Sequence, residues 1–216
     1  MIPRNEQPTL PPMELNALST IQIDALKEVS NIGAGHAATA LSDMTGQKVL
    51  INIPVITIDE LSAIFGKTGG PEQRVVGVLI DLMGDIRGRT LMLFAEAEAY
   101  KFCESLLRRG PGTVTSLSDI ERSALNETSN ILTCAYMNAL GDLLGVMVVP
   151  STPRLLFDTS AAVLRAVSAD GGGGEVVVSI KNEFTFIDNS IKLMGYFLLL
   201  PDHASLQAMF KAMHID

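Results

Sequence analysis

The chain has 216 residues, with 16 basic and 24 acidic side chains and a formal net charge of −8. A hydrophobic fraction of 47% with 19% charged residues is typical of a globular protein with a sizeable core, and the acidic balance argues against nucleic-acid binding. Only two cysteines, no membrane-length apolar run and no signal-peptide core at the start predict a cytoplasmic protein without membrane insertion.

The first half of the chain is predicted to open with a long helix, from about Ile21 to near Gly46, because glycine suits a helix C-terminus. Few residues separate the later apolar runs, which favours antiparallel hairpins over crossover connections. The predicted elements that follow the helix are a β-rich stretch at 48–58, a short helix at 59–66, two β-branched runs at 74–82 and 89–96, and a closing helix at 96–109.

The second half is predicted to repeat this order. Its long helix begins at about Asp119, after a capping box formed by Ser118 and Glu121, and ends near Gly145. The elements that follow are a β-rich stretch at 146–157, a short helix at 160–167, apolar runs at 175–187 and 191–200, and a closing helix at 203–214.

The two halves also align residue by residue, without a gap, at a constant offset of 99 between 24–54 and 123–153. The matched residues include Glu28 with Glu127, Asn31 with Asn130, Leu41 with Leu140, Asp43 with Asp142, Gly46 with Gly145 and Pro54 with Pro153, and just beyond these ranges Asp59 matches Asp158. We therefore predict two fused copies, at about 15–110 and 114–216, within one domain over 1–216 that has a flexible segment at 1–14.

Each long helix carries one stripe of polar and small residues. Asp24, Glu28 and Asn31 fall within an arc of about 60° on the first helix. The stripe continues through Gly35, Ala38 and Ser42, and the second helix repeats it as Ser123, Glu127, Asn130, Cys134, Met137 and Gly141. Opposite it on the first helix lie Leu26, Val29, Ala37, Ala40 and Met44, which are expected to face the core.

The stripe has two explanations, a solvated helix face or a functional site. A solvated face could hold many charged residues, yet each copy offers one acid, one amide and then small residues. Gly33 and Gly35 each cost about 1 kcal/mol relative to alanine in a helix. They indicate either the approach of another backbone or tight packing of the two long helices against each other.

An acid and an amide on a rigid helix can assist a reaction without being its nucleophile. A carboxylate can pair with a cation on a partner, and an amide can hold a water molecule through its donor and acceptor. The pair is suited to assisting hydrolysis of a phosphoryl group that another protein holds. Isolated histidines and a Gly66-Lys67-Thr68 triplet without the earlier glycine of a phosphate-binding loop predict neither a metal site nor a nucleotide site.

Two copies of the pattern [D/S]-x3-E-x2-N-x22-P, at Asp24–Pro54 and Ser123–Pro153, resemble the signature of the CheC chemotaxis phosphatases. The string NIGAGHAATALSDMTG after the first acid is also close to the usual text of that family. The resemblance covers about residue 15 to the end. It implies an α+β fold in which a continuous antiparallel sheet, built from both copies, carries the two long helices on one face.

The resemblance also implies an activity, the hydrolysis of the aspartyl phosphate on the response regulator CheY. By motif position, Asn31 and Asn130 would orient the attacking water, and Glu28 and Glu127 would pair with a lysine of the receiver. Asp24 and Ser123 would support them, and Pro54 and Pro153 would shape the strand beside each site. Magnesium would belong to CheY, so the chain would need no cofactor of its own.

A second implied partner is CheD, a receptor-modifying deamidase, with Asp158 in the short helix of the second copy as a contact. His36 stands where the family commonly has asparagine, and the second copy lacks the NIGAG text. An alternative is a non-catalytic adaptor that binds phosphorylated CheY, CheD or both. A purely structural role in the flagellar motor comes third, because the sequence lacks the switch domain that such a role would need.

Overall fold

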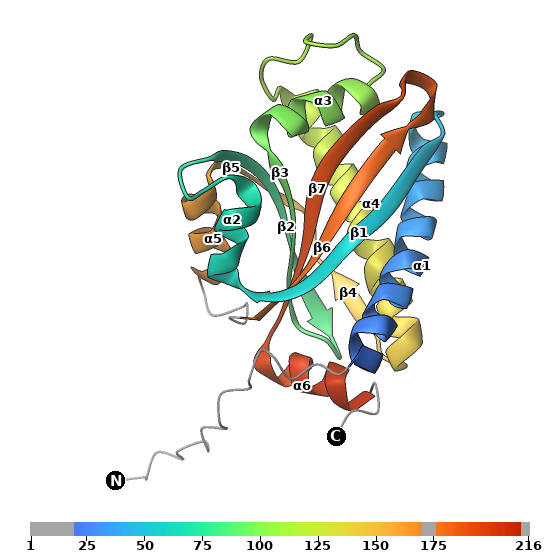
Figure 1. The fold of residues 1–216 in the computed structure, drawn as a ribbon, viewed down its shortest axis with the longest axis vertical. Helices are drawn as coiled ribbons and strands as arrows, with labels where there is room; N and C mark the ends of the chain where they lie inside the picture. The colour runs from blue at the N-terminus through green and yellow to red at the C-terminus, as the bar shows by residue number, and fades with distance from the viewer. Residues whose placement is uncertain (1–19, 170–175, 213–216) are drawn as a thin grey trace.

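The computed structural model describes residues 20–169 and 176–212, so the predicted flexible segment at 1–14 lies outside the described residues. A curved sheet carries helices on both of its faces (Figure 1). The first half comprises α1 (Thr20–Thr45), β1 (Val49–Glu60), α2 (Ile64–Thr68), β2 (Arg74–Gly84), β3 (Gly88–Ala95) and α3 (Glu96–Leu106). The second half comprises α4 (Asp119–Leu144), β4 (Val148–Pro150), β5 (Arg154–Thr159), α5 (Ser160–Ser168), β6 (Val176–Phe186), β7 (Ile191–Pro201) and α6 (His203–Ala212).

Both long helices end, and α4 also begins, where capping chemistry predicts. Gly46 follows α1 with φ 62°, and Gly145 ends α4 in the left-handed region with φ 66°. At the start of α4, the backbone N–H of Ser118 donates to Glu121 Oε2 at 2.9 Å. The Ser118 hydroxyl bond is the main cause that lowers the pKa of Glu121, with Arg109 adding to it against the opposing effect of burial. This carboxylate therefore stays ionised and caps the N-terminus of α4.

The sheet interleaves the two halves of the chain. Its strand order is β1-β6-β7-β3-β2-β4, with β5 also paired with β2, and every pairing is antiparallel. The first strand of each half thus pairs with the other half: β1 with β6, and β4 and β5 with β2. Because neither half completes its sheet alone, we propose that the two copies at 15–110 and 114–216 form one domain.

The inner strands alternate their side chains between two apolar layers. On one face, residues such as Val76, Val78 and Phe197 pack with the buried sides of α1, α3 and α4. On the other face, residues such as Val75 and Leu198 pack with α2 and α5. The inner strands therefore read as continuous apolar runs, and the predicted α+β fold with both long helices on one face of an antiparallel sheet is confirmed.

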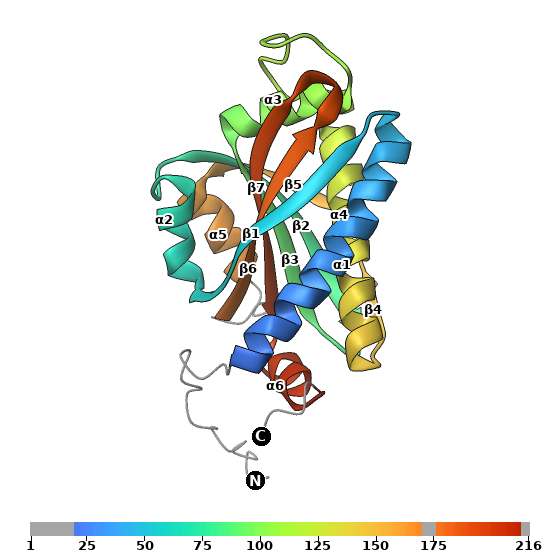
Figure 2. The same ribbon diagram turned by 45° about the vertical axis from the view of Figure 1, so that its right-hand side comes forward.

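The two long helices lie side by side and run in opposite directions, as the colours of both ribbon views show (Figures 1 and 2). They make the most extensive helix–helix contact among the described elements. In the second half, the single predicted stretch at 146–157 is divided into β4 and β5. Pro150 ends β4 and Pro153 precedes β5, and proline, which lacks an N–H donor, limits how far this edge segment can pair with β2.

Candidate functional site on the paired long helices

The first acid and amide lie in the open on α1. The side chains of Glu28 and Asn31 are both exposed. Asp24, one turn before Glu28, is exposed as well and forms an ion pair with Lys27, in which Asp24 Oδ1 lies 3.2 Å from Lys27 Nζ. This exposed pair contributes little stability, since both partners remain hydrated. The first copy therefore presents one carboxylate and one carboxamide on a rigid surface that another protein can reach.

The second copy places the same groups on α4, but it holds its amide more tightly. Ser123 and Glu127 are exposed, whereas Asn130 is half-buried. The thiol of Cys134 donates to Asn130 Oδ1 across 3.8 Å. Burial, and then the carboxylate of Glu127, raise the pKa of Cys134, so this thiol remains a protonated donor. Gly35 stands at the matching position of the first copy, where the amide has no such neighbour.

The polar stripe is open only over its first half. On α4, Met137 and Gly141 are buried. On α1, Ser42 is half-buried because its hydroxyl accepts from the Val49 backbone N–H at 3.0 Å, which seals this part of the helix against β1. The prediction that Met44 faces the core is wrong: 42% of it is exposed near the end of the helix. The open part of each stripe is therefore the acid and amide together with their neighbours.

The structure requires glycine at only one of the two glycine positions that follow Asn31. A Cβ at Gly33 would stand 2.5 Å from Tyr136 Cδ1 and 3.0 Å from Tyr136 Cα, which is closer than real Cβ atoms approach. A Cβ at Gly35 would meet nothing within 4 Å. Tight packing of the two long helices thus explains Gly33. It leaves Gly35 unexplained within the chain, as an open position next to the amide.

The two prolines interrupt the strands that follow the long helices. Pro54 lies in β1, where the register of pairing with β6 shifts between Asn52 and Val55. Pro153 lies in the gap between β4 and β5. A proline at a bulge or between strands avoids the loss of a ladder hydrogen bond. The two prolines thus interrupt the pairing that follows each long helix in different ways, and their role in shaping the sites stays a prediction.

The prediction that Asp158 lies in the short helix is wrong. It lies near the end of β5, where it pairs with Val75. The helix begins later because Thr159 is its cap, accepting from the Ala162 backbone N–H at 3.3 Å. Asp158 is exposed, and its Oδ1 accepts from the Thr159 N–H at 2.7 Å. Its counterpart Asp59 is instead held by Lys67 Nζ at 2.6 Å.

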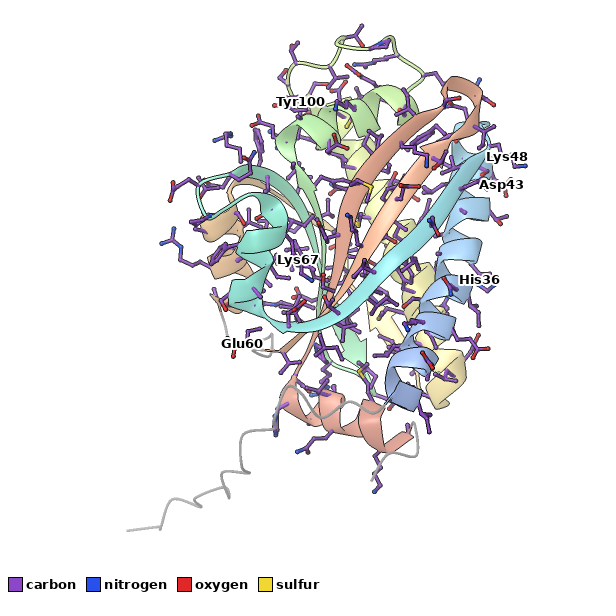
Figure 3. All side chains as sticks on the ribbon, in the orientation of Figure 1. His36, Asp43, Lys48, Glu60, Lys67 and Tyr100 are labelled. Carbon is purple, nitrogen blue, oxygen red and sulfur yellow. The ribbon has the colours of Figure 1, made fainter. Side chains whose placement is uncertain are left out.

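The lysine and the histidine for which the sequence predicts no nucleotide or metal site have a structural role or lie alone. Lys67, labelled in Figure 3, bonds both Asp59 and Thr57, which occupies the only charged group of the Gly66–Thr68 triplet. His36 is exposed on α1 (Figure 3). Across the described residues, no three metal-ligating side chains gather in one place. None of the described helices combines the length and apolar character that crossing a bilayer requires.

Sequence reasoning missed a set of exposed isoleucines around the acids. Ile21 is 76% exposed and Ile32 46% exposed on α1, and Ile120 is 53% exposed on α4. Ile21 and Ile120 each precede the acid of their copy by seven residues, and Ile32 follows Glu28 by four. These spacings place each isoleucine on the same helix face as its acid. The recurrence at the 99-residue offset was the signal that could have revealed them.

Comparison with known proteins gives consistent similarities. The CheC-like family matches residues 21–58, which contain the acid and amide of the first copy. "CheY-P phosphatase CheC" of Bacillus subtilis (strain 168) is 28% identical over 204 residues, which cover 92% of this chain and 96% of that protein. "Flagellar motor switch phosphatase FliY" of the same organism is 27% identical over 151 residues, 69% of this chain but 39% of that protein.

Among solved structures, the crystal structure of Thermotoga maritima FliY matches with a TM-score of 0.73. The match covers 92% of this chain and 98% of the other, at 19% sequence identity. At this identity, the likeness concerns the fold. Together with the sequence matches, it confirms the resemblance that the two motifs predicted.

Proposed function

Because this chain is related to the CheC-like family, we propose that it is a phosphatase that hydrolyses the aspartyl phosphate on the response regulator CheY. The observation that carries the proposal is the repeated pair of acid and amide, Glu28 with Asn31 and Glu127 with Asn130, on accessible faces of two packed helices. Packing of the core does not explain why both copies carry this pair, since Glu28, Asn31 and Glu127 are exposed. The cytoplasmic location expected from the sequence is part of this proposal.

In the proposed reaction, the helix enters the phosphorylated pocket of the receiver. The carboxamide of Asn31 or Asn130 accepts a hydrogen bond from a water molecule and directs its oxygen toward phosphorus. The bond between phosphorus and the aspartyl oxygen breaks as the water oxygen bonds to phosphorus, which yields a free carboxylate, inorganic phosphate and a proton. Glu28 or Glu127 pairs with a lysine of the receiver and holds the two proteins in register.

The receiver supplies the charge that this chain lacks. A phosphoryl group in transfer needs cations near its oxygens, and the open parts of both stripes carry acids, with Lys27 already paired to Asp24. We place the Mg²⁺ on CheY, with no cofactor on this chain. Asp24 and Ser123 support the site from the turn before each acid. This division of labour explains how two uncharged amides suffice as the catalytic contribution of the chain.

Turnover separates an enzyme from the adaptor alternative. With the chain at one hundredth of the concentration of phosphorylated CheY, a phosphatase releases many phosphates per molecule. An adaptor at that ratio leaves the rate of phosphate loss at that of the receiver alone. The measurement is a phosphate-release time course with purified CheY, with and without the chain. A rate that is independent of added chain contradicts the proposal.

We also propose CheD as a partner, with Asp158 as one contact. Asp158 is exposed, whereas its counterpart Asp59 is engaged by Lys67. A groove of about 470 Å³, lined mainly by apolar atoms of the 3₁₀ turn Leu61–Ala63, α2 and α5, lies beside the helix that follows Asp158. An exposed acid just before a helix that lines an apolar groove is a combination that suits a protein partner.

Asp158→Lys is expected to weaken CheD binding at least tenfold, because it reverses an exposed charge just before the helix that lines the groove. Phosphate release from CheY should stay within twofold of the wild type, since the substitution lies outside both stripes. Calorimetry with CheD and the phosphate-release assay measure the two effects. Asp188→Lys, at an exposed acid in the 3₁₀ turn that joins β6 and β7, is the control. Equal CheD affinity in both variants would remove Asp158 from the interface.

A further inference from the structure

The acid of each copy lies beside large apolar side chains that have no core to pack against. On α1, Glu28 has Ile21 two turns before it and Ile32 one turn after it, 76% and 46% exposed. On α4, Glu127 has Ile120 at 53% exposure, whereas Ile131 at the position of Ile32 is partly buried against the core. We call Ile21, Ile32 and Ile120 the flanking isoleucines.

Helix geometry puts the flanking isoleucines in line with the acids. Seven residues span close to two turns and four residues span one, so Ile21, Glu28 and Ile32 lie within about 20° of one line along α1. Asn31 projects about 80° to one side of this line and about 60° from Glu28. A partner that pairs with Glu28 while it reaches the amide therefore also meets the isoleucines, which extend about 10 Å along the axis before the acid and about 6 Å after it.

A solvated helix face does not need these residues. Isoleucine is β-branched and a weaker helix former than lysine, glutamate or glutamine, any of which would suit an exposed position. Isoleucine at the same place in both copies, 53% or more exposed each time, therefore calls for a partner that buries it. Other exposed apolar side chains, such as Met83 and Met147, do not share this alignment with an acid.

We propose that the flanking isoleucines are the apolar anchors with which each long helix docks on the phosphorylated receiver. This inference rests on the proposed function and names a part of the interface that the acid and amide do not supply. The partner surface is an apolar rim next to a cation: the rim covers the isoleucines while the cation pairs with Glu28 or Glu127. An ion pair at the edge of a buried apolar contact is the usual anatomy of a specific interface.

The anchors also make the two sites unequal. The first site offers two exposed isoleucines and an open amide, whereas the second offers one exposed isoleucine and an amide held by Cys134. We therefore expect the first site to dock the receiver with the lower KM. Because the isoleucines do not touch the phosphoryl group, they act on docking and leave the chemical step to the amides.

The test uses the full chain with one site disabled at a time. In an Asn130→Ala background, where the first site alone turns over, Ile21→Gln with Ile32→Gln should raise the KM for phosphorylated CheY at least tenfold. A tenfold change corresponds to about 1.4 kcal/mol. The kcat should stay within twofold, and glutamine keeps the helix propensity. Ile120→Gln in an Asn31→Ala background should raise KM in the same way.

The matched control is Met83→Gln with Met147→Gln, which removes two side chains of 52% and 65% exposure that lie outside the long helices and their acid–amide pairs. Its KM should equal that of the parent. An unchanged KM in the isoleucine variants overturns the proposal. A fall in kcat with an unchanged KM also overturns the proposal. A loss of self-association without a change in KM overturns it as well, because the surface would then be a contact between copies of the chain.

A binding measurement distinguishes failure of this inference from failure of the proposed function. If the parent chain shows no turnover, the phosphatase proposal fails, and the anchors are still testable with receiver loaded with beryllium fluoride and Mg²⁺. Calorimetry should then show a Kd at least tenfold weaker for the isoleucine variants than for the methionine control. Equal Kd values overturn the anchors whatever the turnover.

Discussion

Replacement of both Asn31 and Asn130 with alanine is expected to reduce stimulated phosphate release to the rate of the receiver alone, a loss on the order of 100-fold or more. Alanine removes both the donor and the acceptor that orient the water, and loss of positioning alone costs about this much. The acids remain, so the complex should still form with a Kd within a few-fold of the wild type. Release assays at saturating phosphorylated CheY measure the effect.

The double variant should remain folded. Asn31 is exposed, and Asn130 is half-buried and accepts the weak thiol bond of Cys134. Surface changes of this kind usually alter the free energy of unfolding by about 0.5 kcal/mol or less. Asn138→Ala is the matched control, since Asn138 is an exposed asparagine on α4 outside the stripe. Release at the wild-type rate in the double variant would show that the amides do not position the water.

Local chemistry made the long helices predictable from the sequence. Ser118, Glu121 and the two glycines at 46 and 145 act on neighbouring residues, so caps and left-handed ends could be placed within a residue or two. Pairing between strands is different, because it joins segments that are far apart. Nothing local in β1 states that its partner is β6, more than a hundred residues later.

The candidate site shows the same limit. Helical periodicity identified the face that carries Glu28 and Asn31, and this face is exposed. Periodicity says nothing of what covers a face further along, so Met137 was placed on the open stripe although it is buried, and Met44 in the core although it is exposed. The exposed isoleucines were overlooked because an apolar residue in an amphipathic helix is read as a core residue by default.

Gly33→Ala is expected to destabilise the protein by about 1–3 kcal/mol, the usual cost of overpacking a tight contact. The new methyl carbon would collide with the ring and Cα of Tyr136 at 2.5 and 3.0 Å. Tyr136 cannot withdraw, because it is 2% exposed, its hydroxyl donates to Asn182 Oδ1, and its ring packs 4.7 Å from that of Phe197. The gain in helix propensity, about 1 kcal/mol, is too small to offset this collision.

Gly35→Ala is the matched control, two residues further along the same helix. Its methyl group meets nothing within 4 Å, so the propensity gain should appear undiminished as added stability of up to about 1 kcal/mol. Urea unfolding of the two variants measures the difference, at an unchanged m-value. Equal stabilities would mean that α1 and α4 do not meet at Gly33.

The same pair of variants tests whether the helix pair is the scaffold of the sites. A collision at Gly33 pushes α1 away from α4 at a point two residues from Asn31, and a small displacement of a positioned group costs much of its effect. Gly33→Ala should therefore also lower kcat in an Asn130→Ala background, beyond what the fraction of folded protein explains. Gly35→Ala leaves this contact intact, and a change in its KM alone would place the open position at Gly35 within the docking surface.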